Sequence, residues 1–170
     1  MLPEEVQERL ELRIHGENKH FRGGDFDRKV TALLERTSEV VRPMGAYRNR
    51  DVVSLMRDCD WIVVPSIWWE NSPIVIQEAR MAGRPLLCSN IGGMAEKATP
   101  GVDRLFSAGS PGSLAQRLTE IVTGAVVAVP LALAERSQGI ARTDDGVFAA
   151  HLAVYRGAGA ALGVDRRLAS

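Results

Sequence analysis

One short apolar segment limits the folds that this chain can adopt. Ile62, Val63 and Val64 follow one another without a polar residue between them, and Asp60 and Ser66 stand on either side. A continuous β-branched run of this length is typical of a strand that is covered on both faces, as in a parallel sheet. The sequence therefore predicts an α/β fold in which helices cover a mostly parallel sheet.

A helix is predicted directly after the loop that follows this strand. Asn71 or Ser72 can cap it, and Pro73 fits the first helical position, where its missing N–H costs nothing. The next residues are apolar on almost every side, so we expect a mostly buried helix. Glu78 is the exception, because it lies four residues after Ile74 on the same face and a buried carboxylate without a partner is costly.

Two interpretations of Glu78 stay open at this point. In the first, the carboxylate is structural and either reaches the edge of the helix or pairs with an arginine such as Arg84. In the second, the helix N-terminus binds an anion, because free N–H groups and the macrodipole favour negative charge there. Glu78 then lies roughly 7 to 8 Å along the axis from Pro73, at about 1.5 Å per residue. A ribose attached to a diphosphate at the helix end would lie near that depth, where the carboxylate can accept hydrogen bonds from both hydroxyls.

Four short segments in a fixed order resemble a known family. The residues Glu70–Ala79 resemble the Glu-x7-Glu motif of retaining GT-B glycosyltransferases, in particular glycosyltransferase family 4. Pro65-Ser66, Ala82–Pro85 and Ile91–Glu96 resemble the segments that flank this motif in the family. The resemblance covers residues 45 to 122 well and the flanks more loosely. It implies a Rossmann-like three-layer domain, one half of a GT-B fold, that binds a nucleotide sugar.

The resemblance implies a role for each residue around the predicted helix N-terminus. Glu70 would contact hydroxyls of the donor sugar at the catalytic centre, and Glu78 would bind the ribose; neither is expected to act as a protonating base. The backbone N–H groups of Ser72, Ile74 and Val75 are expected to face the diphosphate. Asn71 is expected to lie at the same site. This helix end would take over a cation's role by stabilising charge on the leaving diphosphate. We therefore expect no bound metal and no cofactor, and a nucleotide-diphosphate sugar as the donor substrate.

Two further positions would line the nucleotide in the resembled family. Gly16 ends a predicted strand and would lie beside the nucleotide, and Tyr47 would lie beside the nucleobase. A plain turn after a strand explains Gly16 equally well, and Tyr47 can equally be a packing residue. Trp68 and Trp69 precede the motif, and adjacent tryptophans are seldom exposed together. We expect one of them to anchor the loop in the core and the other to face a cleft or a sugar ring.

The composition excludes several other classes of function. Basic and acidic residues are equal in number, 21 of each, so no overall field drives binding to nucleic acid or anionic lipid. Neither Gly-x-Gly-x-x-Gly nor Gly-x4-Gly-Lys-Ser/Thr occurs, which counts against dinucleotide-dependent oxidoreductases and P-loop nucleotidases. Cys59 and Cys88 are expected to be buried free thiols, and the histidines form no ligand pattern. We expect a soluble cytoplasmic protein without a transmembrane segment, which in full-length form can lie at the inner face of the membrane.

The remaining pattern predicts alternating strands and helices. In chain order the expected elements are a polar helix over 3–9, a strand Leu10–Ile14, a helix Phe26–Arg36 capped by Asp25, a strand Val40–Pro43, a helix Arg50–Cys59, a strand Arg84–Ser89, a short helix ending at Glu96, an edge strand Leu105–Ser107 and a helix from Ser113 to Val122. We expect the Rossmann-like domain to span residues 1–122. Residues 123–170 are expected to form helices that pack on this domain, with a frayed tail from residue 157.

The resembled domain normally begins with one more strand and helix, which carry a basic pair for the diphosphate. The present sequence is expected to start after them and to lack the amino-terminal acceptor domain, so the isolated chain is expected to be inactive. The alternative is a non-enzymatic Rossmann-like module for protein interaction, in which the sheet edge left by the absent strand pairs two chains into a dimer. These residues do not specify the nucleotide base, the donor sugar or the acceptor.

Overall fold

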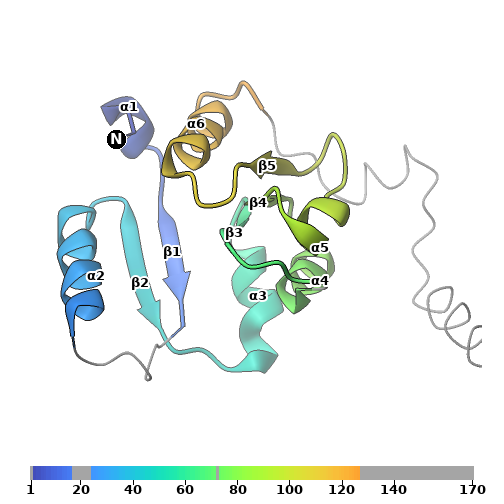
Figure 1. The fold of residues 1–170 in the computed structure, drawn as a ribbon, viewed down its shortest axis with the longest axis horizontal. Coiled ribbons are helices and arrows are strands. Elements are labelled where there is room, and N and C mark those ends of the chain that lie inside the picture. The colour runs from blue at the N-terminus through green and yellow to red at the C-terminus, as the bar shows by residue number, and fades with distance from the viewer. Residues whose placement is uncertain (1, 17–23, 72, 127–170) are drawn as a thin grey trace, which may run out of the picture. The chain divides into compact units, whose positions relative to one another are not determined.

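The computed structural model describes residues 2–16, 24–71 and 73–126. Its elements, in chain order, are α1 (Glu4–Gln7), β1 (Leu12–His15), α2 (Asp25–Arg36), β2 (Val41–Gly45), the 3₁₀ helix η2 (Asn49–Asp51), α3 (Val52–Arg57), β3 (Ile62–Val64), α4 (Ile74–Ala82), β4 (Leu86–Ser89), α5 (Gly92–Glu96), β5 (Arg104–Phe106) and α6 (Pro111–Val122) (Figure 1). The chain divides into two units, residues 1–134 and 135–170, and the second lies outside the described residues. Of the helices predicted over 123–170, the structure describes only residues 123–126, which form a turn after α6; the frayed tail predicted from residue 157 lies outside the described residues.

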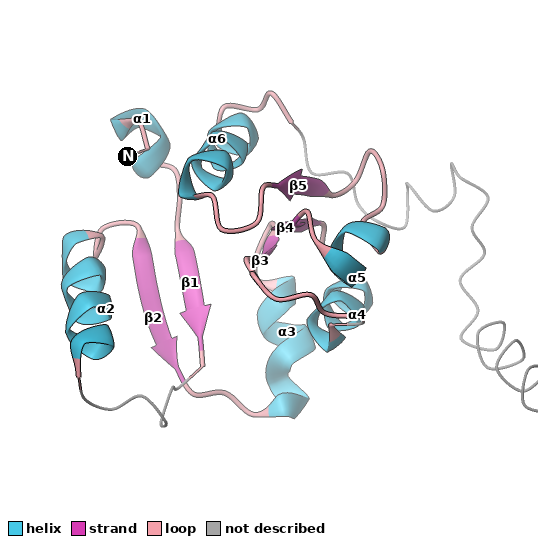
Figure 2. Cartoon of the chain, in the orientation of Figure 1, coloured by secondary structure: helices cyan, strands magenta, loops and turns pink. Residues whose placement is uncertain are grey.

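Strands and helices alternate along the chain, and every strand pair is parallel (Figure 2). β1 pairs with β2, and β3, β4 and β5 form a second sheet in that order. Parallel neighbours need crossover connections, and an α-helix stands between each two consecutive strands. The predicted α/β class is therefore confirmed, although the described strands form two sheets where the sequence predicts one.

The hydrophobic core lies around the three-stranded sheet. All of β4 is buried, and Ile62 and Val64 of β3 belong to the same cluster. The surrounding helices α3, α4 and α5 contribute Met56, Ile76, Ala79 and Met94. Full burial of a side chain such as Leu86 stabilises the fold by roughly 1.5–3 kcal/mol. The prediction of a covered strand at Ile62–Val64 is confirmed, with Val63 half-buried.

Helix α4 begins one residue later than the sequence predicts. Pro73 is its N-cap, with φ −60° and ψ 124°, so its backbone is still extended and it lies just before the first helical position. The predicted cap by Asn71 is not seen among the described residues, and Ser72 lies outside them. At the other end, Gly83 adopts φ 72° and the Arg84 N–H donates to the Ala79 carbonyl at 2.9 Å, which ends the helix.

Helix α4 is also less buried than its apolar sequence predicts. Only Ile76 and Ala79 are fully buried, whereas Ile74 and Met81 are exposed. The helix packs against α3 and the core through one stripe of its surface. An apolar sequence reports which side chains favour burial but not which of them meet a partner, so the prediction of a mostly buried helix is wrong.

Other elements differ from the prediction at their ends. Helix α2 includes Asp25, and Gly24 is its N-cap, so the predicted cap by Asp25 is wrong; the Asp25 carboxylate accepts a hydrogen bond from Arg28 instead. Helix α3 is shorter than the predicted helix Arg50–Cys59, because the first residues of that range belong to the 3₁₀ helix η2 and α3 ends at Arg57. Helix α6 starts at Pro111, earlier than the predicted Ser113, because Ser110 caps it by accepting the Ser113 N–H at 3.2 Å.

Candidate functional site

The loop between β3 and α4 holds Glu70 by a hydrogen bond to the end of β3. Ser66 donates its hydroxyl to Oε1 of Glu70 at 2.8 Å, and the backbone N–H of Trp68 donates to the same Ser66 oxygen at 3.4 Å. Glu70 is half-buried. An ionised carboxylate offers about four acceptor positions, so one bond from Ser66 leaves capacity for further donors. This arrangement can present a fixed acceptor to the hydroxyl groups of a ligand.

Two glycines of α5 let the loop backbone lie directly on the end of β4. The Gly93 N–H donates to the Glu70 carbonyl at 2.7 Å, and a Cβ at Gly93 would lie 2.1 Å from the Asn71 carbonyl oxygen. Gly92 has φ +51°, and a Cβ there would lie 3.0 Å from the same Glu70 carbonyl. Side chains at these positions would push the loop away. The loop backbone therefore lies in close contact with the start of α5, and this contact fixes the position of Glu70.

The N-terminus of α4 follows this loop and offers free backbone donors. The first hydrogen bond of the helix runs from the Ile76 N–H to the Pro73 carbonyl at 3.2 Å. The N–H groups of Ile74 and Val75 precede it, so they belong to the first turn, which has no partners within a helix. The positive end of the macrodipole adds to them. Asn71 is exposed just before this helix end, and Ser72 lies outside the described residues.

Glu78 lies one turn beyond Ile74 on a face of α4 that is partly open. Its side chain is half-exposed, and Ile74 on the same face is exposed. Within the described residues no ion pair joins Glu78 to Arg84, whose guanidinium donates to the Arg57 carbonyl instead. The predicted pair with Arg84 is thus wrong. The half-exposed position fits both a carboxylate at the edge of the helix and a ligand contact.

A second group of predicted residues gathers at the carboxyl ends of β1 and β2. The Gly16 N–H donates to the Gly45 carbonyl at 2.8 Å, with Gly16 at φ 130°. Tyr47 is exposed, and its ring meets that of His15 edge to face, with centroids 6.2 Å apart and planes at 85°. Tyr47 is therefore not a core residue. This group and the one around Glu70 both lie at carboxyl ends of parallel strands, where ligands of open α/β sheets bind.

Both tryptophans of the loop are exposed. Trp68 is 75% and Trp69 is 74% exposed, so neither anchors the loop in the core as the sequence predicts. Trp69 lies over α5, since its Cδ1 would be 3.3 Å from a Cβ at Gly92. The loop is held by backbone contacts and by Ser66, which leaves both indole rings available at the surface.

Sequence reasoning missed three residues at the carboxyl ends of the strands. In the sequence, Ser66 stands out only as part of a motif. Its position four residues before Glu70 is the one feature that could have predicted the hydrogen bond between them. His15 carries no ligand pattern, and only its place before Gly16 at a strand end could have marked it. Ser89, the last residue of β4, is fully buried, and its Oγ has no hydrogen-bond partner in the described structure. Nothing in the sequence distinguishes that serine.

The described residues contain neither a cluster of three metal-ligating side chains nor a helix long and apolar enough to cross a membrane. Cys59 and Cys88 are both free thiols. Burial raises the pKa of Cys88 to about 11, with the Asp103 carboxylate adding to the effect. Burial also raises the pKa of Cys59, which is only half-buried. Neither thiol is activated as a nucleophile, because a nucleophilic cysteine needs a lowered pKa.

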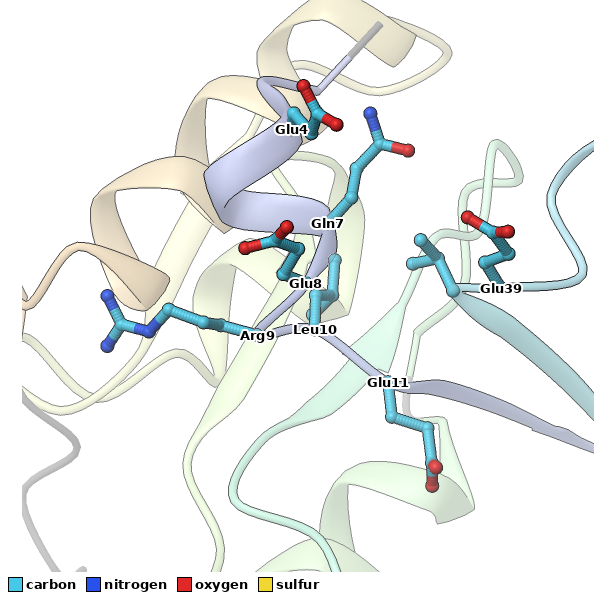
Figure 3. A pocket seen from close by; sticks show the side chains of 8 residues that line it. Glu4, Gln7, Glu8, Arg9, Leu10, Glu11 and Glu39 are labelled. Carbon is cyan, nitrogen blue, oxygen red and sulfur yellow. The ribbon is translucent and has the colours of Figure 1, made fainter.

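A separate pocket lies at the opposite ends of β1 and β2 (Figure 3). Its volume is about 660 Å³, and it lies among residues of α1 and the segments that lead into the two strands. Figure 3 shows four carboxylates along its wall, those of Glu4, Glu8, Glu11 and Glu39. This concentration of negative charge disfavours a diphosphate. The pocket also lies at the amino-terminal ends of the strands, so it is not a candidate for the nucleotide site.

A family model described as glycosyl transferases group 1 matches residues 1–124. Among curated proteins, no match is found. Sucrose-phosphate synthase from Thermosynechococcus elongatus has a similar structure, with a TM-score of 0.68 and 22% identity over 89% of this chain and 39% of that chain.

Two solved structures of Alr3699/HepE from Anabaena are similar as well. The complex with UDP gives a TM-score of 0.62 at 22% identity, covering 75% of this chain and 36% of that chain. The complex with UDP-glucose gives 0.60 at 22% identity, covering 74% and 36%. The fold is thus that of a GT-B glycosyltransferase domain, and the chain spans less than half the length of the solved structures that it matches.

Proposed function

Because the chain belongs to the glycosyl transferases group 1 family, whose model matches residues 1–124, we propose that it is the donor-binding half of a retaining, metal-independent glycosyltransferase of family 4. The observation that carries this proposal is the fixed position of Glu70 just before the N-terminus of α4, held by Ser66 and by the Gly93 N–H. A carboxylate and free N–H groups at one end of a parallel sheet suit a ligand with both sugar hydroxyls and phosphates.

In the proposed complex, Glu70 accepts hydrogen bonds from hydroxyls of the donor sugar. The backbone N–H groups of Ile74 and Val75, with Asn71 nearby, bind the diphosphate and stabilise the charge that develops as it leaves. Ser72 belongs to the proposed site by its place in the motif. Because the helix N-terminus supplies positive potential, the proposed reaction uses neither a metal nor a cofactor, and the nucleotide-diphosphate sugar is a substrate.

The proposed nucleoside contacts come from two strands and one helix. Glu78 binds the ribose hydroxyls from its half-exposed place on α4. Tyr47 lies beside the base, where its exposed ring can stack, and Gly16 lets the backbone approach the nucleotide. The Alr3699/HepE structures in complex with UDP and UDP-glucose support a uridine donor as the first candidate.

The proposed catalytic unit is larger than this chain. GT-B chemistry takes place between two domains, and the chain spans 36–39% of the solved relatives reported above. We therefore propose that residues 1–122 form the donor domain, that the acceptor is held by another domain, and that the isolated chain transfers little or no sugar. A cytoplasmic location, with the complete enzyme at the inner face of a membrane in some cases, belongs to the same proposal.

A non-enzymatic interaction module is the second candidate, and the unpaired sheet edges favour it. Neither β1 nor β3 has a second strand partner among the described residues. Exposed edges of this kind can pair with another chain. Sedimentation over a range of concentrations tests this candidate: dimerisation in a chain that binds no nucleotide would support it, and a monomer that binds one would exclude it.

The experiment that tests donor binding is an NMR titration of the chain with UDP, GDP and ADP. Saturable shifts with one of them are expected to identify the base. Replacing Glu78 with Gln removes charge-assisted bonds to the ribose, each worth about 1.5–3 kcal/mol, so the affinity is expected to fall about tenfold or more. Glu35→Gln is the matched control, because Glu35 is an exposed glutamate of α2. If the chain is folded and no nucleotide shifts its spectrum, or if both variants bind equally, the proposed site is wrong.

A further inference from the structure

Two aromatic rings meet where β1 and β2 end. The imidazole of His15, the last residue of β1, lies edge to face with the ring of Tyr47, with centroids 6.2 Å apart and planes at 85°. Aromatic rings attract one another in this geometry, because the edge of one ring is positive and the face of the other is negative. The pair therefore holds two side chains in a defined orientation at the carboxyl ends of the strands.

The backbone brings the two rings together through an irregularity in the pairing of β1 and β2. Ile14 pairs with Pro43 and His15 pairs with Gly45, so Met44 is an extra residue of β2 at this step. A bulge of this kind re-aims the side chains around it and is enriched beside active sites. Here the irregularity lies at the very residue that carries the imidazole.

A glycine stands at the end of each strand. Gly45 has φ 76° and Gly16 has φ 130°, both in the region that favours glycine. The Gly16 N–H donates to the Gly45 carbonyl at 2.8 Å, which ties the two strand ends together. These glycines set the direction in which the chain leaves each strand, and hence the place of Tyr47 two residues after Gly45.

The ring pair contributes little to the hydrophobic core. Tyr47 is 44% exposed, and His15 is half-buried. The core gathers instead around the three-stranded sheet. Two rings that are held by a specific backbone geometry and yet left partly open are explained better by the surface that they present than by burial.

The pair lines the same cavity as the N-terminus of α4. This cavity has a volume of about 990 Å³, and the residues around it include His15, Tyr47, Pro65 just after β3 and Val75 in the first turn of α4. Sites for small molecules and cofactors occupy about 300–1,000 Å³. A nucleoside diphosphate has a planar aromatic base at one end and a diphosphate at the other, so it suits a space that is bordered both by aromatic rings and by a helix N-terminus.

The perpendicular arrangement leaves ring surface for a ligand. With the planes at 85°, only one of the two faces of Tyr47 can meet the edge of the imidazole, so at least one face of the phenol stays open. A nucleobase can stack on an open aromatic face, since every base has a π-face. A ring that is already held loses less conformational entropy on stacking than a ring that rotates freely. The contact with His15 thus prepares Tyr47 for a base.

We propose that His15 is a positioning residue of the nucleotide site: it holds the ring of Tyr47 edge to face, so that one face of the phenol is ready to stack on the base of a nucleoside diphosphate. This inference rests on the proposed function and deepens it, because it names how the same site meets the base end of the donor. His15 acts through Tyr47 and takes no part in sugar transfer. Since stacking accepts any base, the pair raises the affinity without choosing among uracil, guanine and adenine.

The test measures dissociation constants for five forms of the chain by NMR titration. The forms are the parent, His15→Leu, His15→Phe, Tyr47→Ala and the double variant that combines His15→Leu with Tyr47→Ala. Leucine removes the ring at this position, whereas phenylalanine keeps an aromatic edge. UDP, GDP and ADP are the nucleotide ligands, and inorganic pyrophosphate is the ligand without a base. Circular dichroism checks that each form is folded.

His15→Leu is expected to weaken binding of the nucleoside diphosphate about two- to tenfold, which is the contribution of one aromatic pair, and to leave the affinity for pyrophosphate unchanged. His15→Phe is expected to bind like the parent. Tyr47→Ala is expected to weaken binding at least as much as His15→Leu, and the double variant no further, because His15 acts only through the phenol. In the free parent chain, a nuclear Overhauser contact between the two rings is expected to report the pair without any ligand.

Four results in a chain that binds a nucleotide would overturn the role of His15: parent-like binding by His15→Leu, an equal loss for pyrophosphate, a loss in His15→Phe as large as in His15→Leu, or a further loss in the double variant. Absence of the ring contact in the free chain would overturn it as well. A folded parent chain that binds none of the three nucleotides would instead overturn the proposed function, and the role of His15 with it. If His15→Leu is unfolded, His15→Gln takes its place, because glutamine lacks a ring and stays polar at this half-buried position.

Discussion

Gly93 offers the most direct test of how the loop that carries Glu70 is held. A Cβ placed at Gly93 would lie 2.1 Å from the Asn71 carbonyl oxygen, 2.6 Å from its carbon and 2.8 Å from the Glu70 carbonyl oxygen. All three atoms belong to the backbone, so no side-chain rotation relieves the overlap. In Gly93→Ala the loop must move away from α5, and the 2.7 Å hydrogen bond from the Gly93 N–H to Glu70 must lengthen or break.

The expected loss in the free energy of unfolding is the sum of the overlap and the lost hydrogen bond. Overpacking of a well-packed site costs about 1–3 kcal/mol, and the lost hydrogen bond costs about 0.5–1.5 kcal/mol. We therefore expect the free energy of unfolding of Gly93→Ala to fall by about 1.5–4.5 kcal/mol, measured by urea denaturation followed by circular dichroism. Where the variant still folds, displaced Glu70 is expected to weaken binding of a nucleotide sugar more than binding of the nucleoside diphosphate alone.

The matched control is Gly112→Ala in the first turn of α6. A Cβ at Gly112 meets no atom within 4 Å, and alanine favours the helix over glycine by roughly 0.5–1 kcal/mol. The same chemical change is thus expected to stabilise the chain at Gly112 and to destabilise it at Gly93. If the two variants shift the unfolding midpoint in the same direction, or if Gly93→Ala stays within about 0.5 kcal/mol of the parent chain, the packing of the loop on α5 is wrong.

Three further predictions concern the site and the core. Ser66→Ala removes the 2.8 Å hydrogen bond to Glu70 and is expected to weaken binding of the nucleotide sugar several-fold while leaving the free nucleotide unaffected, as calorimetry with both ligands would show. The thiol of Cys88, whose pKa is about 11, is expected to react with a thiol reagent at pH 8 far more slowly than Cys59; its contribution to stability is present below pH 9 and is lost as the pH rises toward 11. Asp103→Asn breaks a buried bidentate pair with an arginine and is expected to cost about 3–5 kcal/mol in the free energy of unfolding, so a loss below about 1 kcal/mol would contradict the structural role of this carboxylate.

The sequence predicts best where one local property decides the structure. The β-branched run at Ile62–Val64 leaves little choice but a covered strand, and the alternating pattern of the chain predicts parallel strands joined by helices. In each case the residues that carry the signal are also the residues that form the feature.

The sequence predicts burial poorly where it depends on contacts with residues far away in the chain. Ile74 and Ile76 have the same hydrophobicity, yet only Ile76 is buried, because only its side of α4 meets the core. The two tryptophans were expected to divide between core and cleft, but the loop is held by Ser66 and the glycines of α5, which leaves both rings exposed. Hydrophobicity shows which side chains favour burial, but the arrangement of the elements determines which of them pack against the core.

The same reasoning explains why the two groups of candidate residues are described apart. Gly16 and Tyr47 follow β1 and β2, while Glu70 and the N-terminus of α4 follow β3, so their separation is set by what lies between β1 and β3. Each group has the local geometry that its own loop imposes, including the hydrogen bonds from Ser66 to Glu70 and from Gly16 to Gly45. Local geometry gives each group its chemistry, and the spacing of β1 and β3 sets the distance between the two groups.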